Sequence, residues 1–198
     1  MSTVKSNIKN VKSHRLAQIA QLGISIFHTG DLASLWQIKN ANTLHTTLKR
    51  YAKLGLLFRI QRGLYSIKPA SELDPWLLGI RALHEYAYIS AETILARAGI
   101  IFQSLDKITL ISSHSKKFTL GGNNYQSRKL SDKFLFNSAG VRNRNGINMA
   151  TPERAVADML YFNSKAHFDA PNWINWREVK KIQKELGYPL ISKRYDFT

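Results

Sequence analysis

The order of hydrophobic and polar positions is most informative between residues 27 and 68, where helical spacing gives way to strand alternation. A short helix after Thr29 and a second helix ending at Leu54 are predicted from a capping residue and from apolar positions that recur every three or four residues. Two short apolar strands, residues 56–60 and 64–67, follow them as a hairpin. Helix, turn, helix and hairpin is the order of a winged helix-turn-helix, a fold that places its second helix in the major groove of DNA.

The second predicted helix has one apolar side and one polar side. At about 100° per residue, Leu44, Leu48, Tyr51 and Ala52 share the side that is expected to pack on a core. The opposite side carries only neutral polar and basic residues, namely Lys39, Asn42, Thr43, Thr46, Lys49, Arg50 and Lys53. No Asp or Glu occurs between residues 32 and 71. Because a solvated surface helix normally mixes both signs of charge, this side is suited to an anionic partner.

We interpret this polar side as a surface that binds double-stranded DNA. Short polar side chains near the start of a recognition helix reach base edges, which predicts a base-reading role for Asn42, Thr43 and Thr46. Phosphate contacts are predicted for the basic residues of the helix and the hairpin, namely Lys39, Lys49, Arg50, Lys53, Arg59 and Arg62. The alternative is an ordinary amphipathic helix in a basic protein.

Upstream of this region, apolar spacing predicts a first helix from about Val11 to Leu22, which Gly23 ends. Residues 1–10 are polar and basic. They form either an arm that adds phosphate contacts or a frayed terminus.

A polar link predicts a boundary between a winged helix-turn-helix domain, residues 1–70, and a second domain, residues 71–198. Helices of the second domain are expected at residues 75–86, at 91–98 after Ser90 as the cap, from 152 after the cap Thr151, and at 175–186. Short strands are expected at residues 108–111, 117–120, 124–126, 134–136 and 146–149. The predicted fold class is therefore α+β, with a winged helix followed by a mixed α/β domain around a small, mainly antiparallel sheet.

Two details near the end of the chain add to this picture. Arg154 and Asp158 lie four residues apart on the helix that Thr151 opens, so they are placed to form an ion pair. Residues 188–198 are interrupted by proline and are expected to form an extended tail.

Charge is unevenly distributed along the 198 residues, which strengthens the nucleic-acid interpretation. The formal net charge is +16. Residues 1–70 hold seven Lys and four Arg against one Asp, a net charge of +10, whereas residues 71–198 have a net charge of +6. A basic N-terminal part of this kind favours a nucleic-acid partner over a membrane or an acidic metabolite.

No pattern of residues suggests an enzyme. Cysteine is absent, and none of the six His lies at metal-ligand spacing from another, so neither a metal nor a cofactor is expected. The serines lack a nucleophile elbow. No apolar run has the length of a signal peptide or a membrane-spanning helix, so we expect a cytoplasmic protein with no membrane partner.

The second domain has basic clusters of its own, at Lys116–Lys117, Arg128–Lys129, Arg142 with Arg144, and Lys180–Lys184. They form a solvated basic surface, extend the DNA footprint over flanking phosphates, or bind an acidic protein or RNA. The sequence leaves these three interpretations open.

Four segments together resemble a known family. The hairpin region GLLFRIQRGLYSI, the segment YISAETILARAGI, the strand-rich middle and the helix opening TPERAVADML are similar to the AbiE-type (AbiEi) antitoxins of type IV toxin–antitoxin systems. The resemblance covers roughly residues 27–162.

This resemblance implies a bifunctional protein. Its winged helix would repress its own operon by binding inverted repeats in the promoter, and its second domain would counteract a nucleotidyltransferase-type toxin without a stable complex. Charge alone suggests Arg128, Lys129, Arg142 and Arg144 for the antitoxin surface. The alternatives are a stand-alone winged-helix regulator and a protein-interaction module without antitoxin activity.

Overall fold

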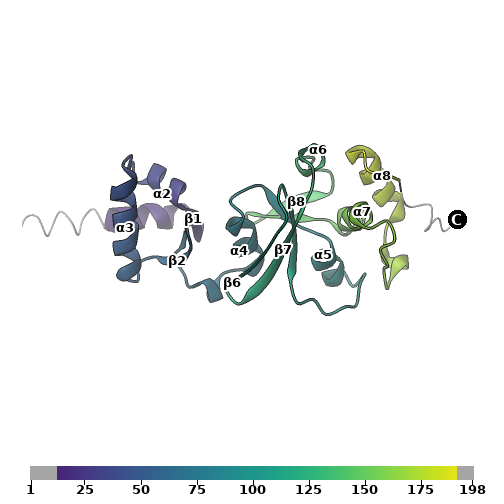
Figure 1. The fold of residues 1–198 in the computed structure, drawn as a ribbon, viewed down its shortest axis with the longest axis horizontal. Coiled ribbons are helices and arrows are strands. Elements are labelled where there is room, and N and C mark those ends of the chain that lie inside the picture. Colours follow the sequence, from purple (N-terminus) through teal and green to yellow (C-terminus); the bar gives the residue numbers. More distant parts are fainter. Residues whose placement is uncertain (1–12, 191–198) are drawn as a thin grey trace, which may run out of the picture. The chain divides into compact units, whose positions relative to one another are not determined.

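The structure, a computed structural model, describes residues 13–190, and these form two compact units that divide between Leu73 and Asp74 (Figure 1). We call them the N-terminal unit and the C-terminal unit. The predicted arm at residues 1–10 and most of the predicted tail, residues 191–198, lie outside the described residues.

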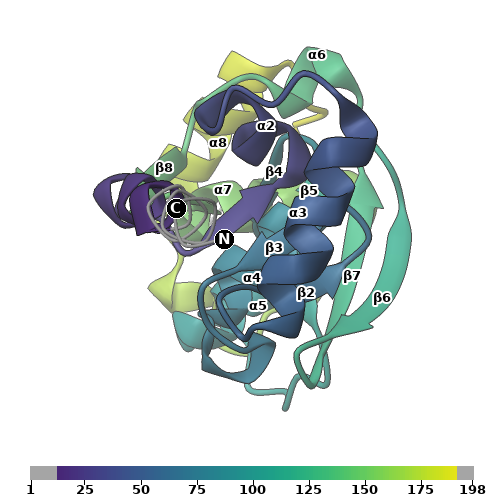
Figure 2. The ribbon, with the colours of Figure 1, turned by 90° about the vertical axis from the view of Figure 1, so that its left-hand side faces the viewer.

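The N-terminal unit combines helices with a three-stranded antiparallel sheet in the order β1-β3-β2. Its elements are a helix over residues 13–21, β1 (Ile26–His28), α2 (Thr29–Leu35), α3 (Ala41–Lys53), β2 (Phe58–Gln61), β3 (Leu64–Ser66) and the short 3₁₀ turn η1 (Ala70–Glu72). In Figure 2 this unit faces the viewer, with α3 running along one side of it.

Local capping explains where the two central helices begin. Asn40 precedes α3, and its side chain accepts the backbone N–H of Thr43 at 3.0 Å. Before α2 the capping residue is His28, and the prediction of Thr29 as the cap is wrong by one position. The backbone N–H of His28 donates to the Asp31 carboxylate at 2.8 Å, so an acid in the first turn of α2 satisfies the N–H of the capping residue.

The buried side of α3 holds the N-terminal unit together. Leu44, Leu48 and Tyr51 are buried there, and the Tyr51 ring lies 5.4 Å from the ring of Trp36, which follows α2. The indole N–H of Trp36 donates to the carbonyl of Arg15 at 3.4 Å, which ties the helix at residues 13–21 to the same core. The opposite side of α3 is therefore left to solvent.

The C-terminal unit is built on a six-stranded mixed sheet in the order β6-β7-β5-β4-β9-β8. Its strands are β4 (Ala87–Ile89), β5 (Ile108–Ser112), β6 (Lys116–Leu120), β7 (Asn123–Lys129), β8 (Val141–Arg144) and β9 (Ile147–Ala150). The prediction of a small sheet is wrong, and two of the pairings, β4 with β9 and β5 with β7, are parallel. The sequence misses β4 because it has only three residues, and β8 because it is almost wholly polar.

Helices cover both faces of this sheet (Figure 1). They are α4 (Pro75–Ala82), α5 (Glu92–Arg97), α6 (Asp132–Leu135), α7 (Pro152–Phe162), the 3₁₀ turn η2 (Pro171–Trp173) and α8 (Trp176–Leu186). On the α4 face, the Tyr125 hydroxyl of β7 donates to the Pro75 carbonyl at 2.9 Å. On the other face, Arg128 of the same strand pairs with Glu92 of α5. No helix among residues 13–190 is long and apolar enough to cross a membrane.

Two predicted elements differ from the structure. Residues 134–136 were expected to form a strand, but Phe134 and Leu135 belong to the short helix α6, because Ser131 and Asp132 open a helical turn just before them. The helix predicted over residues 75–86 ends at Ala82. It ends there because His84 adopts a left-handed backbone with φ of 58°.

The predicted Arg154–Asp158 pair is confirmed, and both side chains are fully buried. Nε of Arg154 donates to Oδ1 of Asp158 at 3.0 Å, and the Tyr188 hydroxyl donates to the same oxygen at 2.9 Å. The hydroxyls of Tyr88 and Ser90 donate to Oδ2 at 3.0 and 2.8 Å. Burial and the nearby Asp158 carboxylate raise the pKa of Tyr88, so its hydroxyl stays protonated and can donate.

The remaining donors of Arg154 reach backbone carbonyls and one hydroxyl. The guanidinium donates to the carbonyls of Asn137 and Ala139 at 3.1 and 2.7 Å, to that of Phe134 at 3.4 Å and to the Tyr88 hydroxyl at 2.7 Å. All five donors of the guanidinium and the four acceptor positions of the carboxylate are thus occupied. This set of contacts joins α7 to β4, to the segment after α6 and to the end of the described chain.

Two predictions about the chain are corrected by the same set of contacts. Ser90 does not cap α5, because its hydroxyl donates to Asp158 instead. Tyr188, the first residue of the predicted extended tail, is packed in the core of the C-terminal unit, where it is buried with its hydroxyl on Asp158.

We predict that Asp158→Asn lowers the free energy of unfolding of the C-terminal unit by about 3–5 kcal/mol, because it leaves the Arg154 charge buried without its counterion. Urea denaturation followed by circular dichroism measures this change. The control is Glu178→Gln, which breaks the exposed ion pair with Lys181 and should cost at most about 0.5 kcal/mol. Equal effects of the two substitutions would contradict the assigned role of the buried pair.

Candidate nucleic-acid interface

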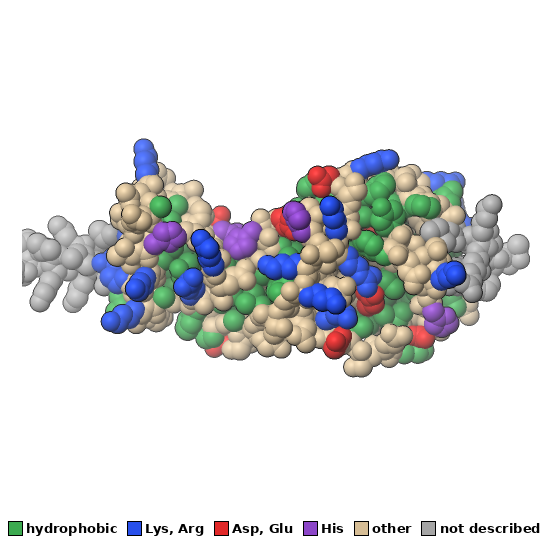
Figure 3. Space-filling model, viewed as in Figure 1, with side chains coloured by type: hydrophobic (Ala, Val, Ile, Leu, Met, Phe, Trp, Pro, Cys, Tyr) green, Lys and Arg blue, Asp and Glu red, His purple; other side chains and the backbone are tan. Residues whose placement is uncertain are grey.

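The residues predicted to contact DNA lie on the exposed side of α3 and on the hairpin that follows it, except Lys39, which was expected on the helix but precedes its capping residue Asn40. Asn42, Thr43 and Thr46 are exposed on α3. The predicted phosphate-binding residues Lys39, Lys49, Arg50, Lys53, Arg59 and Arg62 are exposed as well. Figure 3 shows Lys and Arg side chains over this part of the N-terminal unit. We call this set of nine residues the α3–hairpin surface.

The α3–hairpin surface carries positive charge without local neutralisation. Asp31 and Glu72 are the acids of residues 13–73, and Asp31 already accepts the N–H of His28. Among the described residues, none of the six cations of the surface is paired with a carboxylate. The guanidinium of Arg50 lies 6.0 Å from the Tyr51 ring centroid, which keeps it close to the helix. The charge of the surface is therefore available to a partner.

The three candidate base-reading residues differ in the hydrogen bonds that their side chains already form within the protein. Thr43 donates both its backbone N–H and its hydroxyl to the Asn40 side chain, at 3.0 and 3.3 Å, so its hydroxyl can only accept from a base. Asn42 and Thr46 form no side-chain hydrogen bond within the described part of the chain. Both donors and acceptors of these two side chains are free for a partner.

The hairpin presents its two arginines at and beside its turn. Arg59 lies opposite Tyr65 in the β2–β3 ladder, and Arg62 occupies the turn next to Gly63, which adopts φ of 78°. The Gly63 carbonyl accepts the backbone N–H of Thr29 at 2.9 Å. This hydrogen bond fastens the hairpin turn to the first residue of α2.

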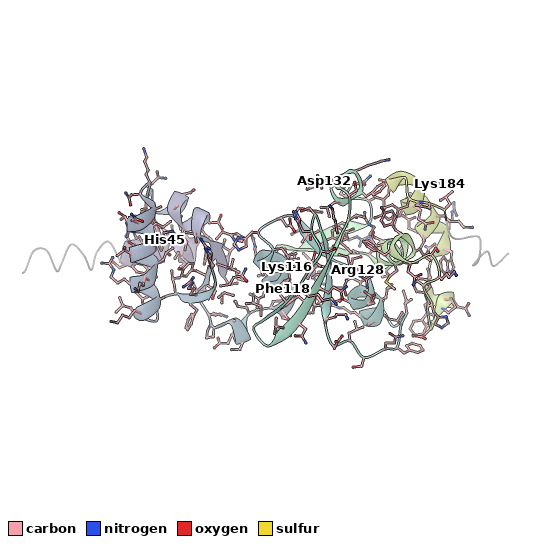
Figure 4. The ribbon with its side chains drawn as sticks, in the orientation of Figure 1. His45, Lys116, Phe118, Arg128, Asp132 and Lys184 are labelled. Atoms are coloured by element: carbon pink, nitrogen blue, oxygen red, sulfur yellow. The ribbon has the colours of Figure 1, made fainter. Side chains whose placement is uncertain are left out.

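One exposed residue of α3 escaped the sequence-based prediction. His45 lies on the exposed side of the helix, one turn from Asn42 and Lys49 (Figure 4). Its spacing of three residues from Asn42 and four from Lys49 already places it on the same side of the helix in the sequence.

The four residues suggested for an antitoxin surface do not come together. Arg128 is half-buried: it pairs with Glu92 and lies 5.7 Å from the Phe162 ring centroid (Figure 4). Arg142 and Arg144 are exposed on the edge strand β8, and Lys129 is exposed on β7. Strands β5, β4 and β9 separate β7 from β8, a distance of about 19 Å at the usual strand spacing. The structure therefore places these four residues on separate parts of the sheet, and their assignment to an antitoxin surface stays a prediction.

A cluster of Ser113, His114 and Glu85 superficially resembles a catalytic arrangement. Partial burial raises the pKa of Glu85, but hydrogen bonds from Ser113 and His114 outweigh this and lower it below its ordinary value. The Ser113 hydroxyl and the Glu85 carboxylate both meet Nδ1 of His114, at 3.0 and 2.8 Å. A Ser-His-acid triad needs them on opposite ring nitrogens, so this cluster lacks the geometry for activating a serine. Among residues 13–190, no three His, Asp or Glu side chains form a group that could hold a metal.

Comparisons with known proteins find a likeness to a solved structure but none at the level of sequence. No family model matches the sequence, and no curated protein matches it. Among solved structures, the crystal structure of the RV2827C protein from Mycobacterium tuberculosis is similar, with a TM-score of 0.54 and 11% sequence identity over 92% of this chain and 73% of that chain. At this identity the likeness concerns the fold alone, and the chain shares an α+β architecture with that protein.

Proposed function

We propose that the N-terminal unit is a winged helix-turn-helix that binds double-stranded DNA, with α3 as its recognition helix. The order α2, α3 and the β2–β3 hairpin fits this fold. The observation that carries the proposal is the exposed side of α3, which has cations and small polar groups but no carboxylate. An α-helix with its side chains is about 10–12 Å across, so a major groove about 12 Å wide admits α3.

The proposed contacts divide into two kinds. Asn42 and Thr46, together with the acceptor of Thr43, would contact base edges, since their polar groups are short and close to the helix start. The six cations of the α3–hairpin surface would bind phosphates on both sides of the groove. The hairpin arginines would do so beside the groove that α3 occupies.

We further propose, from the resemblance to AbiE-type antitoxins, that the protein represses its own operon and counteracts a nucleotidyltransferase-type toxin. Inverted repeats in the promoter would bind two copies of the N-terminal unit related by a twofold axis. Co-expression with the product of an adjacent nucleotidyltransferase-type gene tests the second activity. Restored growth supports it, and DNA binding without restored growth supports a stand-alone regulator instead.

We predict a steep dependence of DNA affinity on salt. If all six cations of the α3–hairpin surface contact phosphates, log affinity should fall with log salt concentration with a slope of about −5. Fluorescence anisotropy with a labelled duplex from the chain's own upstream region measures this slope. A slope near zero would rule out the phosphate assignment.

We predict different effects for a phosphate contact and a base contact. Arg62→Ala should weaken binding to specific and random duplexes alike and reduce the salt slope by about 1, because it removes one phosphate contact. Thr46→Ala should change the preference among sites, with a loss of about 1–3 kcal/mol on the preferred duplex.

Both variants are compared by competition gel shift with Arg177→Ala, which removes an exposed cation of α8 in the C-terminal unit. That control should bind like the unchanged chain. If Thr46→Ala weakens specific and random DNA equally, the base-reading role is wrong.

A further inference from the structure

A pocket of about 490 Å³ lies in the C-terminal unit, between the start of α4, the end of α5 and the β8–β9 hairpin. Its walls include Trp76 and Asp74 from the start of α4, Arg97 from α5, and Arg144 and Met149 from the hairpin. This volume lies within the range of about 300–1,000 Å³ that is usual for small-molecule sites.

Two guanidinium groups give the pocket its charge. Arg97 and Arg144 are exposed, and neither is paired with a carboxylate among the described residues. The Arg97 guanidinium lies 4.8 Å from the ring centroid of Trp76, so the indole holds it in place at the wall. A planar guanidinium that is fixed in this way can donate two parallel hydrogen bonds to a phosphate.

The hairpin holds Arg144 in a defined position. Asn145 and Gly146 form its turn with φ of 54° and 79°, as in a tight two-residue hairpin. The Asn143 side chain accepts the N–H of Gly146 at 3.2 Å, which stabilises this turn. Arg142, opposite Met149 in the ladder, shares the face of the sheet on which Arg144 lies and adds positive charge beside the pocket.

One oxygen of the Asp74 carboxylate is already hydrogen-bonded to the backbone at the start of α4. Its Oδ1 accepts the N–H groups of Trp76 and Leu77 at 2.8 and 3.1 Å, so it caps α4. Its other oxygen forms no hydrogen bond within the described residues. That oxygen can accept a hydroxyl or an amino group of a ligand.

The rest of the wall is apolar. Trp76, Ile147 and Met149 offer a flat, polarisable surface next to the two guanidinium groups. A ligand that uses the whole pocket therefore needs an anionic group, a hydroxyl or amino donor, and a planar ring.

We propose that this pocket binds a nucleoside phosphate. The phosphate is held by Arg97 and Arg144, a hydroxyl or amino group meets Asp74, and the base lies against Met149 and Ile147. The pocket belongs to the C-terminal unit, so this inference does not depend on DNA binding by α3.

Isothermal titration of the full chain with AMP, GMP, CMP and UMP tests the proposal, alongside adenosine and inorganic phosphate. At least one monophosphate should bind saturably, and at least about tenfold more tightly than either adenosine or phosphate, because each of these lacks half of the contacts. Arg144→Ala should weaken that binding by about tenfold to a hundredfold, as expected for hydrogen bonds to a charged group.

Two matched variants remove a cation elsewhere. Lys117→Ala removes a cation of β6 outside this pocket, and Arg50→Ala removes a cation of the α3–hairpin surface. Both variants should bind the monophosphate as tightly as the unchanged chain does. Absence of saturable binding up to about 1 mM would overturn the proposal. Equal affinity for inorganic phosphate and for the monophosphates would also overturn it. Loss of monophosphate binding in Arg50→Ala but not in Arg144→Ala would overturn it too, because the ligand would then bind at the α3–hairpin surface.

Discussion

The fully buried ion pair between Arg154 and Asp158 is the constraint on which the C-terminal unit depends. A buried charge is tolerated only when each of its polar atoms has a partner, and here those partners come from four separate parts of the chain. Replacing such a pair by apolar residues can leave a protein equally stable, whereas losing one member does not. The pair joins segments that are far apart in the sequence: α7, β4, the segment after α6 and Tyr188.

The N-terminal unit presents the opposite situation. The cations of the α3–hairpin surface are exposed and unpaired with carboxylates among the described residues, so they repel one another and contribute little to folding. Stability comes instead from the buried side of the same helix, where Leu48 and Tyr51 pack against Trp36. The core thus depends on the buried side of α3 alone, and exposed side chains can vary without loss of that core.

The sequence predicted correctly those features that depend on residues close together in the chain. The spacing of Leu44, Leu48 and Tyr51 was enough to place Asn42 and Thr46 on the exposed side of α3. The hairpin turn and the Thr151 cap were also predictable, since each depends on a few neighbouring residues.

Features formed by distant segments were not predictable from the sequence. Ser90 has the pattern of a helix cap, yet its hydroxyl is taken by Asp158, which lies 68 residues away. Arg128 looks like a surface cation, but it meets Glu92 only because β7 passes α5. The pocket beside Arg144 likewise requires three separated segments. Each of these depends on the strand order of the sheet, which includes a three-residue strand and a polar edge strand that carry almost no pattern.

The hydrogen bond from Thr29 to the Gly63 carbonyl has a consequence for how a duplex could be accommodated. It couples the tip of the hairpin to the helix that precedes α3, so the hairpin has little freedom to swing relative to the helices. A partner with a different groove width would have to change its own shape. In that case, selection among sites would depend on how easily each sequence bends or narrows, including at base pairs that no side chain touches.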